Sequence, residues 1–263
     1  AQSFRPINTF TIGFNEKQYN EARHAKSVAQ HLGTDHTEYY VSSDEAQLVI
    51  PKLASLYDEP FSDSSQIPTF LVSQLAKKNV TVALTGDAGD ELFGGYNRYN
   101  WMRKMLKVPA PMRSLLANGI NSISPKGWDQ IYRCIVPVLP KGLNLPQFGD
   151  KVHKLASVLG MKSAGEVYKR LVSSWDNPNV LVLGGHELSN LSHAWDLLSD
   201  YDSVENRMMA LDALTYLPDD ILCKVDRAAM GVSLETRIPF LDHRLVEFAW
   251  KLPLHMKIRG GQG

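Results

Sequence analysis

The sequence predicts an α/β protein that has a parallel sheet with flanking helices, followed by a largely helical C-terminal part. In the first hundred residues, short β-branched and aromatic runs alternate with amphipathic helical patterns, which is typical of a layered α/β sheet. After Tyr96 nearly all patterns are helical. The length of 263 residues, with 44% hydrophobic and 21% charged residues, is that of an ordinary globular protein.

The first predicted elements are a strand over residues 9–14 and a helix that ends before Gly33. The strand is β-branched and aromatic, and apolar residues then recur at helical spacing from Tyr19 to Leu32. Glycine commonly follows a helix end because it adopts the left-handed conformation without steric cost. Residues 36–41 predict a second short strand.

Two more helices and a third strand are predicted before the glycine-rich segment. Ser42 and Glu45 fit a capping box, ahead of an apolar helical face over residues 46–56. The next helix is predicted over residues 66–78. Residues 80–84, Val-Thr-Val-Ala-Leu, form a continuous apolar run, which favours a buried parallel strand.

The C-terminal part is predicted to consist of helices separated by proline and glycine. These helices cover residues 101–118, 128–138, 151–159, 164–173 and 206–216. We place a boundary between an α/β part, residues 1–105, and a mostly helical part, residues 106–263, of the same domain.

Composition excludes several functional classes. Lys plus Arg (28) balance Asp plus Glu (28), so no overall positive field favours nucleic acid or an anionic membrane. Cys134 and Cys223 form no CxxC or zinc-ligand pattern, which makes a reducing cytoplasm the default location. No apolar run approaches the roughly 20 residues of a membrane-spanning helix, and the start has no signal-peptide pattern.

The most informative segment is Thr85-Gly-Asp-Ala-Gly-Asp-Glu-Leu-Phe-Gly-Gly-Tyr96. A predicted strand ends just before it and a predicted helix begins inside it, where free backbone N–H groups and the helix dipole favour an anion. Asp87, Asp90 and Glu91 repel phosphates unless a hard cation lies between them. The pattern therefore predicts a Mg–nucleotide loop. In the alternative, Asp90 and Glu91 only offset the helix dipole.

A pair of cations in the C-terminal part fits the same chemistry. Lys224 and Arg227 lie three positions apart on a predicted helix and so face the same way. Asp226 can orient one of them, and two cations on one face suit a polyphosphate leaving group. The alternative is a solvated helix surface with weak ion pairs.

Residues 85–96 resemble the second nucleotide-site motif of the glutamine-hydrolysing asparagine synthetases. Ala88 stands where that motif often has glycine. Three other stretches resemble the family in the same order, and they are residues 10–14 with 19–21, residues 58–69 and residues 222–242. The resemblance is to the synthetase domain and implies an ATP-pyrophosphatase or adenine nucleotide α-hydrolase-like fold. Nothing between about 105 and 205 is diagnostic.

The resemblance also implies roles for individual residues, with ATP and Mg²⁺ as cofactors. The implied nucleotide-binding residues are Ile12, Thr85, Gly86, Gly89 and Asp90, the first three of them around adenine and ribose. Asp90 and Glu91 are the implied metal residues.

Three further residues are implied to be catalytic. Asp87 occupies the acidic position thought to help proton transfer during ammonia attack, and the lysine of the family corresponds to either Lys224 or Arg227. Residues 58–65 are expected to shape the acceptor pocket, although a helix-entry turn has the same polar density. Glu235 and Arg237 are expected to form a buried or half-buried structural ion pair.

The implied reaction is formation of asparagine. The side-chain carboxylate of aspartate attacks the α-phosphorus of ATP, giving an acyl-adenylate and pyrophosphate, and ammonia from glutamine then displaces AMP. One alternative is a related amidotransferase or β-lactam-type synthetase that acts on another carboxylate, with residues 59–65 setting the difference. An alternative of another class is a non-catalytic module that binds a nucleotide or a partner.

The expected partners are these small substrates and an N-terminal glutaminase domain of the full-length chain, with a homodimer as a further expectation. The family's Ser-Gly-Gly-x-Asp-Ser pyrophosphate loop does not occur in these 263 residues, and the chain has no starting Met. We therefore expect a synthetase domain truncated at both ends, which alone catalyses neither ATP–pyrophosphate exchange nor glutamine hydrolysis.

Overall fold

The computed structural model describes residues 4–15, 20–136, 147–173, 190–201 and 203–260, with positions 175, 180, 182 and 184 between them. Tyr19, which belongs to one of the family-like stretches, lies outside the described residues. The chain divides into two compact units. The first unit is Ala1–Gly89 with Thr215–Phe248, and the second unit is Asp90–Leu214 with Ala249–Gly263. This division falls at Gly89 and not near residue 105.

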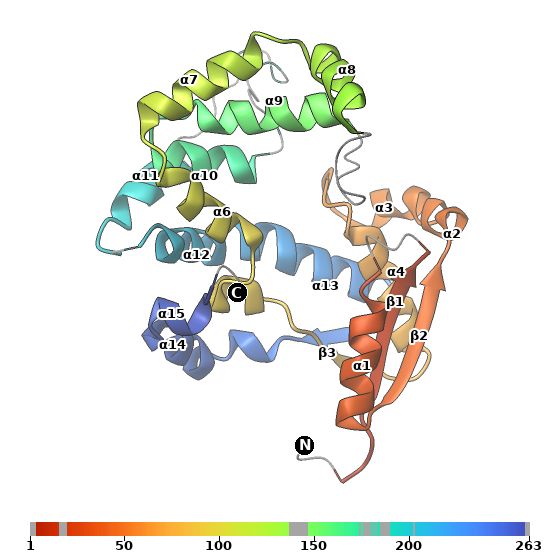
Figure 1. Ribbon diagram of the computed structural model, residues 1–263. Coiled ribbons are helices and arrows are strands. Elements are labelled where there is room, and N and C mark those ends of the chain that lie inside the picture. The colour runs from red at the N-terminus through yellow and green to blue at the C-terminus, as the bar shows by residue number, and fades with distance from the viewer. Residues whose placement is uncertain are drawn as a thin grey trace. The chain divides into compact units, whose positions relative to one another are not determined.

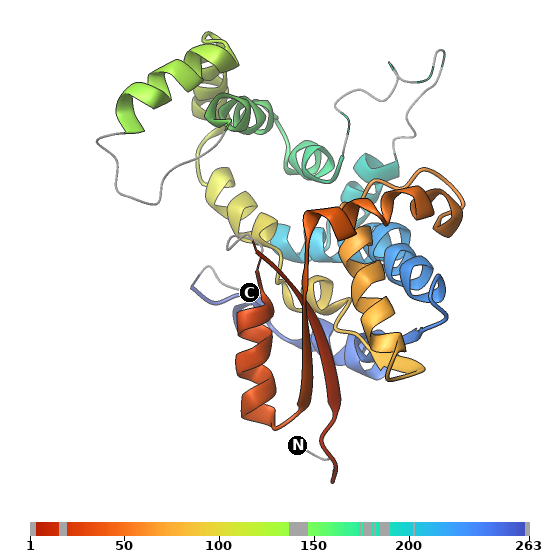
Figure 2. The same ribbon diagram turned by 90° about the vertical axis from the view of Figure 1, so that its right-hand side faces the viewer.

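The first unit begins with a parallel β–α–β arrangement. Strand β1 (Asn8–Phe14) pairs with β2 (Asp35–Val41) in register from Asn8 opposite Asp35 to Phe14 opposite Val41. Helix α1 (Ala22–Leu32) connects the strands and ends at Gly33, whose φ of 65° is left-handed. Figure 2 shows α1 on one side of the strand pair and α4 on the other. These elements confirm the predicted first strand, helix and second strand.

The capping box is confirmed, but the single helix predicted over residues 46–56 is wrong. Ser42 accepts a hydrogen bond from Glu45 N, and Glu45 reaches back to the Ser42 N–H, at the start of α2 (Ser43–Gln47). A second helix, α3 (Ile50–Leu56), then begins with Pro51 in its first turn. The break follows because proline has no N–H to continue the hydrogen bonds of α2. Helix α4 (Gln66–Lys77) agrees with prediction to within one residue.

The sheet also differs from the prediction, which had one parallel sheet. Strand β3 (Val82–Leu84) pairs in parallel with β4 (Glu235–Arg237), and among the described residues these two form a sheet separate from β1 and β2. Val82 is 41% exposed and Leu84 72% exposed, so the prediction of a buried strand is wrong. The reason is a cavity of about 550 Å³ beside β3, lined also by residues of β1 and α4.

The rest of the first unit packs around helix α13 (Cys223–Met230). A π-helical turn, η3 (Leu217–Leu222), leads into α13, and α13 packs along α4. A short 3-10 helix, η4 (Pro239–Leu241), follows β4, and α14 (His243–Lys251) begins in this unit. The apolar core consists of three small clusters, centred on Phe70, Leu234 and Leu217.

The second unit is helical. Its helices are α5 (Gly89–Phe93), α6 (Asn97–Leu106), α7 (Ala110–Asn121), α8 (Pro125–Ile135), α9 (Phe148–Leu159), α10 (Ala164–Val172), α11 (Asn190–Leu197), α12 (Val204–Leu214) and α15 (Leu254–Lys257). Helices α7 and α8 both pack on α9, as Figure 1 shows. No helix in the described part of the chain is long and apolar enough to cross a membrane.

The predicted helix over residues 101–118 is two helices, and the second unit has one large core. The break between α6 and α7 follows from Pro109 and Pro111, which cannot continue the helical hydrogen bonds of α6. The core includes Tyr99, Met208 and Leu211, all fully buried, with Tyr96 and Trp101 packed against it. The helix predicted over residues 128–138 includes positions 137 and 138, which lie outside the described part of the chain.

Candidate functional site

The glycine-rich segment begins in the first unit as a tight turn after β3. Thr85 N donates to Arg237 O at 3.0 Å, and Gly89 N donates to Gly86 O at 3.3 Å. Ala88, in the middle of the turn, has a φ of 68° and is buried against Leu217 and Ile221. Because a left-handed conformation costs a residue with a Cβ roughly 1–2 kcal/mol, this turn explains why the resembling motif often has glycine there.

Thr85 and Asp87 of the same turn have side chains suited to a ligand. Thr85 Oγ1 is buried and has no hydrogen-bond partner among the described atoms, which is uncommon because buried polar groups are normally paired. Asp87 is half-buried. The turn therefore presents an unpaired hydroxyl and a carboxyl group within three positions.

The second unit begins at Asp90, and the two following glycines have separate roles. Asp90 is exposed, and its carbonyl oxygen accepts hydrogen bonds from Gly94 N (2.9 Å) and Gly95 N (3.1 Å). A methyl group at Gly95 would overlap Asp90 Oδ1, and Gly94 has a φ of 77°. The glycine pair therefore shapes the backbone around the Asp90 carboxylate.

Glu91 differs from Asp90 in its surroundings. It is 1% exposed, and its Oε1 accepts a hydrogen bond from Tyr96 OH at 2.8 Å. Burial raises the pKa of Glu91, and the hydrogen bond from Tyr96 only partly opposes this. The Glu91 side chain thus points into the protein interior. Asp90, which is exposed, is therefore the better candidate for a metal ligand.

A buried network around Asp212 supports this corner of the second unit. Asp212 is 0% exposed and accepts hydrogen bonds from Tyr99 OH (2.5 Å) and Tyr168 OH (2.9 Å). Its Oδ2 also lies 2.9 Å from Arg98 Nη2. The Arg98 guanidinium in turn lies 3.9 Å from the ring centre of Tyr96, so the network reaches the residue that holds Glu91.

Sequence reasoning missed Asp212. The available signal is its position directly after the apolar run Met208-Met-Ala-Leu211, since an acidic residue on the buried side of a helix needs a partner. The partners themselves come from α6 and α10, far away in the chain, and no local pattern identifies them.

The two predicted cations of α13 have different surroundings. Lys224 is 8% exposed, and its Nζ lies 2.8 Å from Asp63 Oδ2 and 2.8 Å from Ser65 Oγ. Arg227, with a side chain 45% exposed, pairs with Asp226 at 2.9 Å and with Asp58 at 3.1 Å. The predicted pair of cations on one face is therefore one buried cation and one exposed cation.

The carboxyl groups next to Lys224 are shifted in opposite directions. Burial alone would raise the pKa of Asp63, but hydrogen bonds from Lys224 and Ser65 outweigh it and lower that pKa. Burial and the nearby charge of Asp63 raise the pKa of Asp220, a residue of the π-helical turn η3. Burial also raises the pKa of Tyr57 to about 12. Asp63 is thus the partner whose charged form Lys224 stabilises, whereas the pKa of Asp220 is shifted upward.

The structure also locates the other predicted residues of the first unit. Ile12 is half-buried in β1, opposite Tyr39 of β2. Glu235 and Arg237 form an ion pair at 2.8 Å, but their side chains are 53% and 67% exposed. The expectation of a buried or half-buried pair is wrong, because both residues lie on the outer, solvent-facing positions of the short strand β4.

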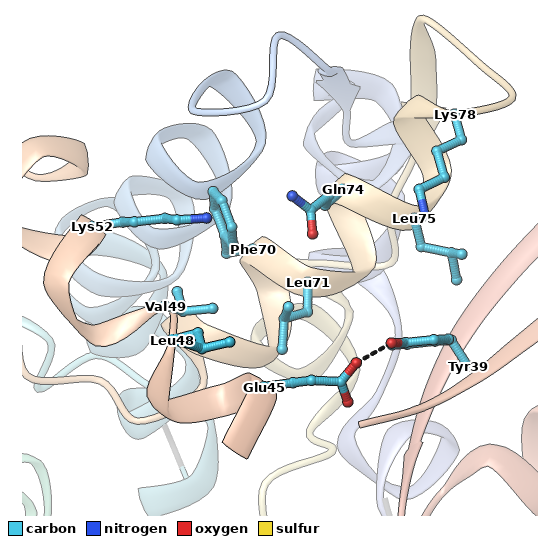
Figure 3. A pocket seen from close by; sticks show the side chains of 10 residues that line it. All are labelled: Tyr39, Glu45, Leu48, Val49, Lys52, Phe70, Leu71, Gln74, Leu75 and Lys78. Atoms are coloured by element: carbon cyan, nitrogen blue, oxygen red, sulfur yellow. Dashed lines mark hydrogen bonds between the residues drawn. The ribbon is translucent and has the colours of Figure 1, made fainter. Parts of the chain in front are cut away.

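A second, smaller cavity of the first unit lies away from the glycine-rich turn. It measures about 190 Å³ and is lined by side chains from β2, α2, α3 and α4. Figure 3 shows its mostly apolar wall, with Lys52 and Lys78 at two places and the Tyr39 hydroxyl donating to Glu45 at another. None of the predicted site residues lines it, so this cavity is separate from the candidate site.

The described residues contain no group of three or more His, Cys, Asp or Glu side chains placed to hold a metal ion. Mg²⁺ typically binds through one or two protein carboxylates, with phosphate oxygens and water completing its coordination. The exposed carboxylate of Asp90 fits that requirement.

Comparisons with known proteins point to a single family. The model of the family described as asparagine synthase matches residues 1–263. The chain is 30% identical over 265 residues to "Asparagine synthetase [glutamine-hydrolyzing] 1" of Bacillus subtilis (strain 168), covering 99% of this chain and 39% of that protein.

Two further relatives agree. Identity is 43% over 235 residues to "Putative asparagine synthetase [glutamine-hydrolyzing] 2" of Methanocaldococcus jannaschii, covering 85% of this chain and 40% of the relative. The chain is also 30% identical over 258 residues to a putative asparagine synthetase of Mycobacterium tuberculosis (strain ATCC 25618 / H37Rv). This match covers 95% of this chain and 36% of the relative. The chain thus spans about two fifths of the length of these relatives.

Proposed function

The chain belongs to the asparagine synthase family, and on that premise we propose that it is part of an ATP-dependent amide ligase. The complete enzyme adenylates the side-chain carboxylate of aspartate and transfers ammonia from glutamine to it, giving asparagine, AMP and pyrophosphate. The observation that carries this proposal is the turn at Thr85–Gly89, which follows a parallel strand and holds an unpaired buried hydroxyl next to an acidic residue. Such turns bind nucleotides in α/β proteins.

We assign the binding of ATP and Mg²⁺ to individual residues. In the first unit, Ile12, Thr85, Gly86 and Gly89 bind the nucleotide, with Thr85 Oγ1 as a hydrogen-bond donor or acceptor for it. In the second unit, Asp90 holds Mg²⁺ through its exposed carboxylate. Mg²⁺ supplies positive charge that stabilises the departing pyrophosphate. Glu91, the next residue in the chain, is buried and accepts a hydrogen bond from Tyr96, and we assign it a role in supporting Asp90.

Asp87 is assigned to proton transfer in the same proposal. Ammonia that attacks an acyl-adenylate must lose a proton, and a carboxylate near the reacting carbon can accept it. Asp87 is half-buried and lies two residues after Thr85, so its carboxyl group retains access to solvent. The role of Asp87 is therefore that of a general base.

We also propose an occupant for the cavity of about 550 Å³ in the first unit. It lies between β1 and β3, and its walls include Phe10, Val72, Val80 and Leu234. Because the cavity separates the parallel pair of β1 and β2 from that of β3 and β4, an additional parallel strand in it would join β1 to β3 in a continuous sheet. The family's pyrophosphate loop follows such a strand, and residues outside these 263 supply it in the complete protein.

The test uses the full-length protein with aspartate, ammonia and Mg–ATP, and it measures AMP and asparagine. We expect Asp90→Asn to lower the rate by about a hundredfold, the scale for loss of one preorganised electrostatic contact. Asp150→Asn is the matched control, because Asp150 is an exposed acid in the first turn of α9.

Two outcomes would contradict the proposal. Normal Mg-dependent activity of Asp90→Asn would remove the metal assignment. If aspartate is inert and another carboxylate in a panel forms an amide, the enzyme is a related synthetase with a different acceptor.

A further inference from the structure

The acceptor loop, defined as residues 58–65, is held at both of its ends by one residue of α13. Near its end, Lys224 Nζ contacts Asp63 and Ser65 at 2.8 Å each. At the residue just before its start, the hydroxyl of Tyr57 donates to the backbone oxygen of Lys224 at 3.4 Å. The ring of Tyr57 also stacks on that of Phe61, with centroids 4.7 Å apart. Lys224 therefore joins both ends of the loop to α13.

The lysine contacts continue into a local hydrogen-bond system. Asp63 Oδ1 accepts from both the backbone N–H and the hydroxyl of Ser65 at 2.7 Å, which forms the turn before α4. Asp63 thus uses one oxygen for the turn and the other for Lys224. Loss of the ammonium would leave a half-buried carboxylate with only its local partners, and breaking a buried ion pair is strongly destabilising.

Arg227 has the opposite character. Its partner Asp58 is 85% exposed, and its other partner Asp226 is 58% exposed. Ion pairs between exposed groups contribute about 0–1 kcal/mol, so a phosphate group can replace either carboxylate at little cost. A guanidinium also binds phosphate oxygens in a bidentate way.

We propose that Lys224 is a positioning residue, which sets the acceptor loop through Asp63 and Ser65, and that Arg227 is the cation of α13 that contacts the pyrophosphate group. This inference rests on the proposed function and deepens it, because it separates two cations that the sequence treats as equivalent. Lys224 then governs recognition of the carboxylate substrate, and Arg227 governs the leaving group.

Asp220 completes the positioning cluster from the π-helical turn η3. One of its carboxyl oxygens is buried without a hydrogen-bond partner among the described atoms, and its pKa is raised by burial and by the charge of Asp63. Asp220 thus adds a second carboxyl group beside the Asp63–Lys224 pair.

The experiment compares Lys224→Met and Arg227→Gln in the full-length protein, with Lys126→Met and Arg133→Gln on the exposed side of α8 as matched controls. Hydrogen–deuterium exchange follows the amides of residues 61–66, and calorimetry follows binding of inorganic pyrophosphate with Mg²⁺. We expect Lys224→Met to speed loop exchange by about tenfold or more and to keep the pyrophosphate Kd within about twofold. Arg227→Gln should raise that Kd by about tenfold without changing loop exchange.

A steady-state readout separates positioning from a merely structural role. Lys224→Met should raise the KM for aspartate while the KM for Mg–ATP stays close to that of the wild type. Lys224→Arg, which keeps a positive charge for Asp63, should restore part of the loop protection if Lys224→Met does not fold.

Three results would overturn the inference. The first is a weakened affinity for pyrophosphate in Lys224→Met with unchanged loop exchange, and the second is normal pyrophosphate binding by Arg227→Gln. The third is no pyrophosphate binding by the wild type. Absence of amide formation from aspartate in the wild type would reject the proposed function, whereas the exchange and calorimetric readouts would still decide the roles of Lys224 and Arg227.

Discussion

The two units of this chain differ in how they bury polar groups. In the second unit, one continuous core surrounds Asp212, and the carboxylate is saturated by Tyr99, Tyr168 and Arg98. In the first unit, three small apolar clusters share space with a cavity of about 550 Å³. The buried carboxylate of the second unit is thus fully paired, although this unit also has a cavity of about 720 Å³, lined by residues of α7, α9 and α10. The cavity of the first unit is lined mostly by apolar residues beside β3 and has space for additional chain or ligand. Substitutions should therefore act differently in the two units.

The largest expected effect is that of Asp212→Ala in the second unit. It leaves Arg98 buried without its carboxylate, and removing one partner of a buried ion pair costs about 3–5 kcal/mol. Urea denaturation of the chain measures the effect. Asp196→Ala, which removes an exposed acid of α11, is the control and should change stability by less than about 0.5 kcal/mol. A loss below about 1 kcal/mol in Asp212→Ala would contradict the importance of this network.

Two glycines of the second unit should respond with opposite signs. Gly95→Ala places a methyl group against Asp90 and should destabilise by about 1–3 kcal/mol, as overpacking does. Gly119, in α7, has nothing within 4 Å of an added Cβ, so Gly119→Ala should stabilise by about 0.5–1 kcal/mol through helix propensity. Thermal unfolding of both variants checks the pair. Equal effects in the two variants would show that the space around Asp90 is not constrained.

Filling the cavity tests the first unit. Ala76, on α4, lines the cavity and is 4% exposed. In this chain alone, Ala76→Leu should add buried apolar area and stabilise by about 1 kcal/mol. In the full-length protein the same change should destabilise, because the proposed additional strand occupies that space. The same sign in both proteins would argue against a strand there.

The pH dependence of stability should differ between two carboxyl groups of the first unit. Asp63 has a lowered pKa, so its contribution is present above the ordinary value of 3.8 and is lost as the pH falls through the native pKa. Asp220 has a raised pKa, so its contribution is present below 3.8 and is lost as the pH rises through the native value.

Asp220→Asn cannot titrate and should therefore gain stability relative to the wild type as the pH rises above about 4. Urea titrations between about pH 4 and pH 8 measure this difference. Glu91→Gln should follow the same sign in the second unit, because burial also raises the pKa of Glu91. If the stability gained by either variant over the wild type shrinks as the pH rises, the raised pKa of that carboxyl group is contradicted.

The smallest expected effect is that of Glu235→Gln. The Glu235 and Arg237 side chains are 53% and 67% exposed, so loss of their ion pair should change stability by less than about 0.5 kcal/mol. Urea denaturation at low and high salt checks this. A larger change in stability would instead support the buried or half-buried ion pair that was expected from the sequence.

Local signals account for the parts of the fold that were predicted correctly. The left-handed Gly33 and the capping box of Ser42 and Glu45 involve residues only a few positions apart, so their patterns are complete in the sequence. The same holds for the alternation of β1, α1 and β2. Prediction failed at residues 48–51 and 107–111, where the apolar pattern continues but proline interrupts the hydrogen bonds.

For the candidate site, the sequence by itself determined the family and the residue types: the acidic, glycine-rich segment from Thr85 to Tyr96 and two cations on α13. Only the tertiary structure decided their surroundings. Lys224 meets Asp63 across 161 positions, and Asp212 meets Tyr99 across 113. Burial and charge pairing depend on such distant partners, and they make one cation of α13 a buried anchor and leave the other exposed.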